Sequence, residues 1–466
     1  MMTPKLRVMD VRVTTRPVGL RLPFRYGVVT LREAREARVS VLIQLEDGRQ
    51  ATGHAAELLA PKWFDKSPEL SNEDNVEQLL RAVELARQAY LSTDTPLTAF
   101  GLHARHDPGH HKACAQENLN GLVAGFGNAI LDKAIIGALC IALDTSFSKL
   151  VRSNAVGLTS ATAPDLAAFD FGAFLARLAP QASIIARHTV GLVDAIFESD
   201  IDSATRVDDG LPESLEAAIK AWGLKAFKIK VGGDQTKDLE QLVRIASLLD
   251  RGEEPYLCTL DGNEQYQDGE AFATFHSAML ADKRLSRLVA STHMIEQPIA
   301  RSEALSRPLG ELGARVPIEI DESDNSIDAF VQARALGYRG ISSKSCKGVY
   351  RALLNRARVT KWNAEEGAER YFMSAEDLST QPGLALQQDL ALASLIGCTH
   401  VERNGHFYGD GKTGIDDVHR SFYQNNQPGL YRQEQERLQL AINAGVIDLH
   451  SLEQTSSYSN LPTTGC

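Results

Sequence analysis

The chain has 466 residues, 43% of them hydrophobic and 23% charged, a balance typical of a water-soluble globular protein with more than one structural unit. Its formal net charge of −11 argues against nucleic acid or an anionic membrane as the main partner, because both attract basic surfaces. The six cysteines form no CxxC pair and the N-terminus lacks the apolar stretch of a signal peptide. We therefore expect free thiols and a cytoplasmic location.

Residues 1–155 are predicted to form an α+β capping domain. Segments 11–14 and 39–45 are rich in β-branched residues, and the turn Glu46-Asp47-Gly48 follows the second, which indicates an antiparallel hairpin or meander. A helix-start signal at 71–74 precedes the amphipathic run 76–90.

Two further segments of this domain need interpretation. The apolar window 121–143 carries Asp132 and Lys133 near its middle, so a buried helix is favoured over a membrane span. A polar stretch surrounds Pro108-Gly109, and without a companion cysteine it is interpreted as a loop rather than a zinc site. Its histidines are His103, His106, His110 and His111.

From about residue 184, short apolar strands alternate with amphipathic helices, which predicts a parallel sheet of the α/β class. The number of repeats fits a closed barrel better than an open doubly wound sheet. The expected strands are 184–189, 226–231, 256–260, 293–295, 317–320, 340–343, 370–373 and 399–402. The expected domains are a connecting segment 156–182, a barrel 183–425 and a C-terminal segment 426–466 packing back on the cap.

Charged side chains stand at the ends of successive predicted strands, where barrels hold their active sites. Three converging carboxylates repel each other unless a cation joins them, and an all-oxygen site suits Mg²⁺, with Mn²⁺ as an alternative. Lysines beside such an ion are expected to have lowered pKa values, which would make two of them proton-transfer groups. In chain order the residues are Lys228, Lys230, Asp261, Glu296, Asp321 and Lys344.

This ordered set resembles the muconate lactonizing enzyme-like (mandelate racemase/muconate lactonizing enzyme) group of the enolase superfamily. The resemblance extends more weakly over nearly the whole chain, and it implies a modified TIM-type (β/α)7β barrel with an N-terminal capping domain. It rests on Lys228-Ile229-Lys230, Asp261-Gly262-Asn263, Glu296-Gln297-Pro298, Asp321-Glu322-Ser323 and the Lys344 segment.

The resemblance also implies roles for these residues. Asp261, Glu296 and Asp321 match the metal ligands, and Lys230 and Lys344 match acid/base groups on opposite faces of the substrate. Two further residues of the set match groups that contact the substrate, and the last predicted strand supplies a third candidate for this role. These three are Lys228, Asn263 and Glu402.

The activity implied is Mg-dependent removal of the proton alpha to the carboxylate of a small substrate, through an enediolate. Racemisation or epimerisation, cycloisomerisation and elimination can each follow, so an isomerase or a lyase is expected. Relatives commonly form symmetric assemblies, so a homo-oligomer is expected too.

The sequence departs from the family pattern in three places. The long interval between Asp261 and Glu296 predicts an extra segment near residues 282–284. Lys347 stands where the family usually has a double glycine, and we expect it to be structural or on the surface. The seventh strand ends without a histidine, which speaks against the mandelate racemase-type subgroup.

Two other classes of protein stay open from the sequence. One is a catalytically silent relative that serves as a binding or scaffold protein. The other is a barrel aldolase that forms a Schiff base through Lys228 or Lys230.

Overall fold

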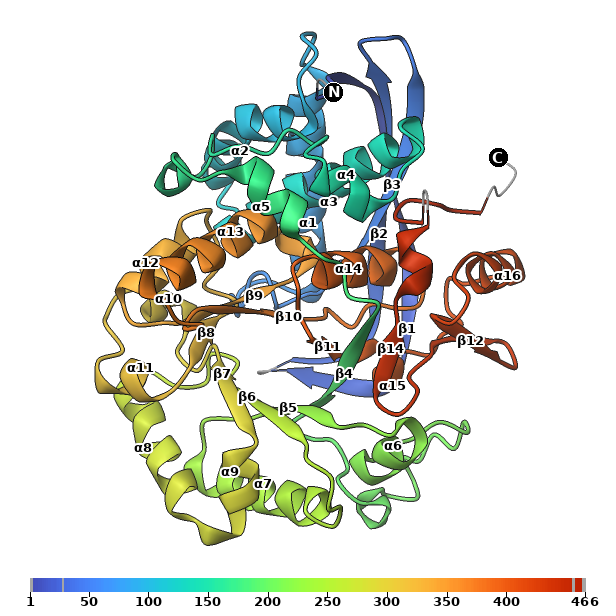
Figure 1. The fold of residues 1–466 in the computed structure, drawn as a ribbon. Coiled ribbons are helices and arrows are strands. Elements are labelled where there is room, and N and C mark those ends of the chain that lie inside the picture. The colour runs from blue at the N-terminus through green and yellow to red at the C-terminus, as the bar shows by residue number, and fades with distance from the viewer. Residues whose placement is uncertain (1–2, 27–28, 455–456, 463–466) are drawn as a thin grey trace.

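The computed structural model describes residues 3–26, 29–454 and 457–462, and Figure 1 shows a cap above a barrel. The cap contains an antiparallel sheet in the order β1-β2-β3, as the hairpin signals predicted. Its strands are β1 (Leu6–Tyr26), β2 (Val29–Leu45) and β3 (Gln50–Leu58). Its helices are α1 (Asn72–Leu91), α2 (Ala99–Gln116), α3 (Gly121–Ala142) and α4 (Phe147–Arg152), and α5 (Phe171–Arg177) leads into the barrel.

Local signals set the start of α1. Ser71 is its N-cap and accepts a hydrogen bond from the Asp74 backbone N–H at 3.1 Å, while the Asp74 carboxylate accepts one from the Ser71 backbone N–H at 2.7 Å. This reciprocal pair satisfies two N–H groups that have no partner inside the helix. The predicted start of this helix is confirmed.

Helix α3 is buried as predicted. Of the described helices, it is the one long and apolar enough to cross a membrane, and its whole apolar window lies inside the protein. Its two charged residues are paired, which buried charges require. Asp132 accepts a hydrogen bond from the Tyr90 hydroxyl at 2.8 Å, and Lys133 lies 2.6 Å from the Glu57 carboxylate.

The polar loop predicted around Pro108-Gly109 is wrong, because these residues lie inside helix α2. His103 Nδ1 lies 2.8 Å from Asp132 Oδ2, and His110 Nε2 lies 2.8 Å from the Ala124 carbonyl oxygen. These contacts and the packing of α2 against α3 outweigh the weak helix propensity of proline and glycine.

The barrel strands run parallel in the order β10-β9-β8-β7-β6-β5-β4-β11. β10 and β11 contact each other, but the described residues form no ladder between them, so one seam lacks strand hydrogen bonds. The curled sheet confirms the predicted fold class. The strands are β4 (Ser183–Val190), β5 (Ala226–Lys230), β6 (Leu257–Asp261), β7 (Thr292–Glu296), β8 (Ile318–Ile320), β9 (Gly340–Ser343), β10 (Phe372–Ala375) and β11 (His400–Arg403).

Helices connect successive strands and cover the barrel on the outside (Figure 1). The extra segment predicted after Asp261 is present, because a 3-10 turn at Lys283–Leu285 and helix α9 follow α8. The connecting helices are α6 (Leu215–Trp222), α7 (Gln235–Leu249), α8 (Gly269–Ala281), α9 (Ser286–Ala290), α10 (Arg301–Ala304), α11 (Glu311–Arg315), α12 (Ala329–Ala335), α13 (Val349–Glu366) and α14 (Leu384–Leu395). Helices α15 (Gly405–Tyr408) and α16 (Asp417–Asn426) follow the last barrel strand.

The C-terminal segment touches both parts of the protein. β12 (Tyr431–Glu434) and β13 (Arg437–Leu440) form a hairpin, and β14 (Val446–Asp448) pairs antiparallel with β4 of the barrel. Farther on, the Tyr458 ring stacks on Phe147 of the cap with centroids 4.2 Å apart. The cysteines from Cys114 to Cys398 are free and buried, and Cys466 lies outside the described residues.

Strand β1 descends from the cap along the barrel toward α15 (Figure 1). Near its lower end, the Arg21 guanidinium forms a two-point ion pair with Asp209, in which each nitrogen lies 2.8 Å from a carboxylate oxygen. Arg21 also donates to the Phe407 carbonyl at 2.9 Å. These bonds hold the cap over the carboxyl ends of the strands.

We expect Gly53→Ala to destabilise the cap by about 1–3 kcal/mol, a typical cost of overpacking. A Cβ at Gly53 would lie 2.1 Å from the Ala134 carbonyl oxygen and 2.2 Å from the Ala138 nitrogen, and helix backbone cannot move aside. The matched control is Gly109→Ala in α2, where a Cβ meets nothing within 4 Å. This variant should stabilise the protein by up to about 1 kcal/mol, because alanine favours a helix over glycine. Urea unfolding midpoints measure both, and equal midpoints would contradict the close β3–α3 approach.

Candidate active site

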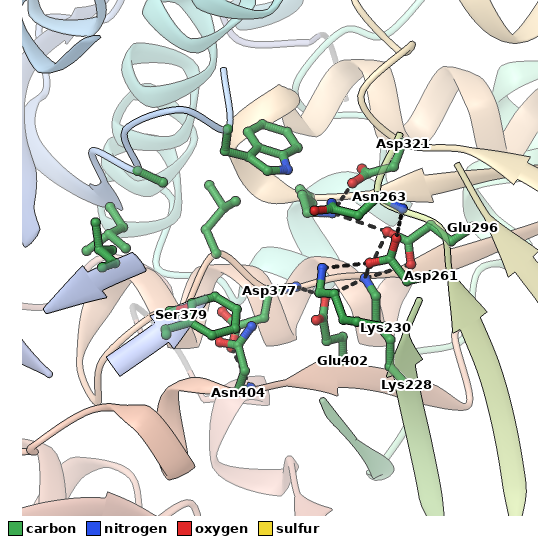
Figure 2. Close-up of a pocket in the computed structure, with 17 residues that line it drawn as sticks. Lys228, Lys230, Asp261, Asn263, Glu296, Asp321, Asp377, Ser379, Glu402 and Asn404 are labelled. Carbon is green, nitrogen blue, oxygen red and sulfur yellow. Dashed lines mark hydrogen bonds and ion pairs between the residues drawn. The ribbon is translucent and has the colours of Figure 1, made fainter. Parts of the chain in front are cut away.

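A pocket lies between the cap and the carboxyl ends of the barrel strands. Every site residue predicted from the sequence lines it, and Figure 2 shows most of them converging. Strand geometry explains the convergence, because parallel strands bring their carboxyl ends to one edge. The predicted residues are Lys228, Lys230, Asp261, Asn263, Glu296, Asp321, Lys344 and Glu402.

Lys228 is the most heavily paired of these side chains. On β5, Lys228 and Lys230 are two positions apart and both reach the pocket, as the alternation of a strand requires. The Lys228 ammonium is buried, so its charge depends on these neighbours. Its Nζ lies 3.2 Å from Asp261, 2.6 Å from Glu296, 2.6 Å from Glu376 and 3.0 Å from Glu402.

Lys230 and Lys344 pair with different carboxylates. Lys230 Nζ lies 2.7 Å from Asp261 Oδ2. Lys344 Nζ lies 2.7 Å from Asp321 Oδ2 and 4.0 Å from Glu296 Oε1. Each lysine therefore contacts a different one of the predicted metal ligands, and both ammonium groups line the same pocket.

No family model and no curated protein matches the sequence. Solved structures do resemble its fold. A mandelate racemase/muconate lactonizing enzyme from Roseiflexus sp. aligns with a TM-score of 0.59 and 17% identity, over 98% of this chain and 98% of that one. The chain has the fold of the enolase superfamily.

Two dipeptide epimerases share this enolase-superfamily fold. The enzyme from Enterococcus faecalis V583, solved with Mg and L-Leu-L-Tyr, has a TM-score of 0.58 and 15% identity, with 95% of this chain and 99% of that chain covered. The enzyme from Methylococcus capsulatus, solved with Mg and L-Arg-D-Lys, has a TM-score of 0.56 and 17% identity over 95% and 99%. At such identities the likeness establishes the fold, and function has to be argued from the site.

Two overlapping sets of carboxylates could hold a metal ion. Glu296, Glu319 and Glu376 each offer an oxygen within 4.8 Å of the others. The predicted set of Asp261, Glu296 and Asp321 lines the pocket, and ammonium groups lie between its members. Both sets supply only oxygen donors, and Glu319 Oε2 has no hydrogen-bond partner among the described residues, so the donor chemistry fits a hard divalent cation.

The expected lowering of the lysine pKa values is not found in the protein alone. Burial is the largest influence and lowers the pKa of Lys230, but the charges of Asp261, Glu402 and Glu296 together outweigh it and the pKa is raised. The same balance, with Asp321 as the main partner, raises the pKa of Lys344. Conversely, burial and then the charges of Asp261 and Glu376 raise the pKa of Glu296 well above its usual range. The prediction of lowered lysine pKa values assumed the positive field of a bound ion, whereas in the protein alone the negative field of the carboxylates acts on the lysines.

The cap closes the pocket with the end of strand β1 and with the segment that follows β3. Phe24 and Trp63 line it, and Lys344 Nζ lies 5.2 Å from the centroid of the Trp63 indole. Arg301 of the barrel donates to the Trp63 carbonyl at 2.9 Å and pairs with Glu264 at 2.7 Å. Lys66 of the cap pairs with the same carboxylate, so one partly buried cluster fastens the Trp63 segment to the barrel.

A deeper layer of the barrel was missed by sequence reasoning. Arg187 pairs with Glu376, which lies 2.6 Å from Lys228, while Glu319 accepts a hydrogen bond from Ser374 at 2.9 Å. Strand alternation was the available signal. Glu319 lies two positions before Asp321, so it faces the same interior one layer below.

Lys347 is buried and structural, and the surface alternative is wrong. Its ammonium lies 2.9 Å from Asp321 Oδ1 and donates to the carbonyl oxygens of Asp321 and Ser342 at 2.9 and 3.1 Å. The Ser342 hydroxyl also donates to Asp321 Oδ1. Together they hold the Asp321 carboxylate while its second oxygen faces Lys344.

We expect Lys347→Met to destabilise the protein by about 1–3 kcal/mol, because it leaves buried acceptors around Asp321 without a donor. Lys361→Met, on the outer part of helix α13, is the control and should change stability by less than about 0.5 kcal/mol. Chemical unfolding measures both. Equal stability of the two variants would show that Lys347 does not hold this loop.

Proposed function

We propose that this protein is a divalent-metal-dependent isomerase of the enolase superfamily that moves the proton next to the carboxylate of a small substrate. The observation that carries the proposal is the placement of Lys230 and Lys344. The two ammonium groups line one pocket and pair with separate carboxylates, Asp261 and Asp321. The similar folds of racemases and epimerases support the same reaction class.

The chain's own residues would divide the work as follows. Asp261, Glu296 and Asp321 would hold Mg²⁺, with Mn²⁺ as an alternative, and Lys228 would help bind the substrate carboxylate. When bound, the ion supplies positive charge where negative charge develops as the proton leaves. Lys230 and Lys344 must give up their ion pairs and lose a proton before either can act as a base, since an ammonium group has no lone pair.

Racemisation or epimerisation is the outcome we favour. With two lysines in one pocket, one can remove the proton and the other can return a proton to the opposite face. Cycloisomerisation and elimination share the first step. A Schiff-base aldolase fits less well, because Lys228 contacts carboxylates on several sides and these outweigh burial to raise its pKa well above the usual range. A cytoplasmic location and a homo-oligomer stay predictions.

Exchange of the α proton with solvent tests the reaction. With racemic carboxylates in D₂O and Mg²⁺, we expect the proton on the carbon next to the carboxylate to exchange for deuterium. Proton NMR measures this exchange. Lys230→Ala should suppress exchange of one enantiomer and Lys344→Ala that of the other, each by about 10²–10⁴-fold. Lys361→Ala on α13 is the control. Exchange that persists in the double lysine variant would refute the assignment.

Two carboxylate variants decide which set holds the ion. If the pocket-lining set binds Mg²⁺, Asp321→Asn should weaken Mg²⁺ binding by more than about 10-fold, since even outer-shell changes cost about 10–100-fold. The Mg²⁺ affinity of Glu319→Gln should then stay closer to that of the parent protein. Calorimetric Mg²⁺ titration after EDTA treatment measures both. If Glu319→Gln weakened Mg²⁺ binding more than Asp321→Asn did, the ion would be placed on Glu296, Glu319 and Glu376.

A further inference from the structure

The pocket has two ends of different chemistry. Figure 2 shows Asp321, Glu296 and Asp261 on one side of Lys230, and Ser379 and Asn404 on the other. We call the second the distal end. If the substrate carboxylate binds beside Lys228, the rest of the substrate extends toward these residues.

The distal end offers no cation for a second substrate carboxylate. Among the described residues that line the pocket, the cations are Lys228, Lys230 and Lys344, and all three are paired with barrel carboxylates. Lys66 of the cap and Arg301 of the barrel are engaged with Glu264. A second anionic group would lose its hydration there without gaining a partner.

The carboxylates at the distal end are already in use. The Asp377 carboxylate accepts hydrogen bonds from the Thr380 backbone N–H at 2.9 Å and hydroxyl at 2.8 Å, and from the backbone N–H groups of Asn404 at 3.1 Å and Gly405 at 3.3 Å. Glu402 accepts from the Thr189 hydroxyl at 2.6 Å and from Lys228 at 3.0 Å. A carboxylate offers about four acceptor positions, so Asp377 has none left for a substrate ammonium. Glu402, which also accepts from the Asp377 backbone N–H at 3.4 Å, has about one.

Asn404 is a group at this end that remains open. Its side chain lines the pocket and is 2% exposed, and its Oδ1 has no hydrogen-bond partner among the described residues. A buried amide without a partner is costly, which favours a ligand that supplies one. A neutral amide or hydroxyl satisfies it without bringing a charge into the pocket.

The apolar walls of the pocket come mainly from the cap. The lining residues there are buried hydrophobic side chains, so they favour an uncharged substituent. They are Phe24, Leu31, Leu58, Ala60, Trp63 and Leu378.

We propose that the pocket selects a monocarboxylate whose distal part is uncharged and apolar and carries one neutral group that hydrogen-bonds to Asn404. The selection differs from recognition of a free amino group or of a second carboxylate. It rests on the proposed function only for the position of the substrate carboxylate.

Three matched probes test this selection by calorimetry with the Mg²⁺-supplemented protein. They are N-acetyl-L-leucyl-L-tyrosine, L-leucyl-L-tyrosine and N-succinyl-L-leucyl-L-tyrosine, whose distal groups are a neutral amide, a cationic amine and an amide that carries a carboxylate. We expect the acetyl probe to bind at least about 10-fold more tightly than either charged probe. Asn404→Leu should weaken its binding roughly 3- to 10-fold. Asn404→Asp should reverse the preference toward the free amine, and Asn425→Asp on the exposed face of α16 is the control.

The outcomes separate the two proposals. Equal or tighter binding of a charged probe, or no binding of any probe at millimolar concentration, overturns the inferred selection. If an Asn404 variant fails to fold, the affinities of the three probes for the wild-type protein decide whether the selection holds. Exchange of the tyrosine α proton, followed by NMR on the same samples, reports on the proposed function separately. Selective binding of the acetyl probe without exchange would support the selection and count against the reaction.

Discussion

The structure depends on mutual neutralisation of charges that are removed from water inside the barrel. Lys228 touches four carboxylates, Asp261, Glu296, Glu376 and Glu402, and all five side chains are almost completely buried. A charge in such surroundings is tolerable only beside its opposite. Strand geometry supplies that neighbourhood, because successive strand ends present acids and lysines to a single point. Removing any one partner leaves the others uncompensated, which makes the cluster a unit rather than a set of independent pairs.

The cap completes this unit. Lys133 of α3 pairs with Glu57 of β3, and the Glu57 carboxylate also accepts a hydrogen bond from the Ser345 hydroxyl at 3.0 Å, one residue beyond Lys344. On the opposite flank, Arg301 and Lys66 converge on Glu264 and hold Trp63 over Lys344. Because the walls of the pocket come from both domains, substitutions in the cap can alter which substrate binds while the charged cluster in the barrel stays the same.

The sequence predicted the strands and their charged ends because both signals are local. Alternation with a period of two places Lys228 and Lys230 on one face, and the parallel order brings Asp261, Glu296 and Asp321 to one edge. Capping chemistry likewise fixed the start of α1 at Ser71. Local signals failed where packing decided the outcome. The segment around Pro108 is helical because it packs on α3, and Lys347 is buried because Asp321 and Ser342 need a donor.

By itself, the sequence determined the fold class, the order of strands and helices and the identity of the residues at the strand ends. Tertiary structure alone decided which charges pair and which polar atoms stay open. Lys228 and Glu376 are 148 positions apart in the chain, so no local pattern could place them 2.6 Å from each other. The saturation of Asp377 and the open amide of Asn404 are of the same kind. Hydrogen-bond capacity depends on every neighbour in space, whereas secondary structure depends mainly on neighbours in the chain.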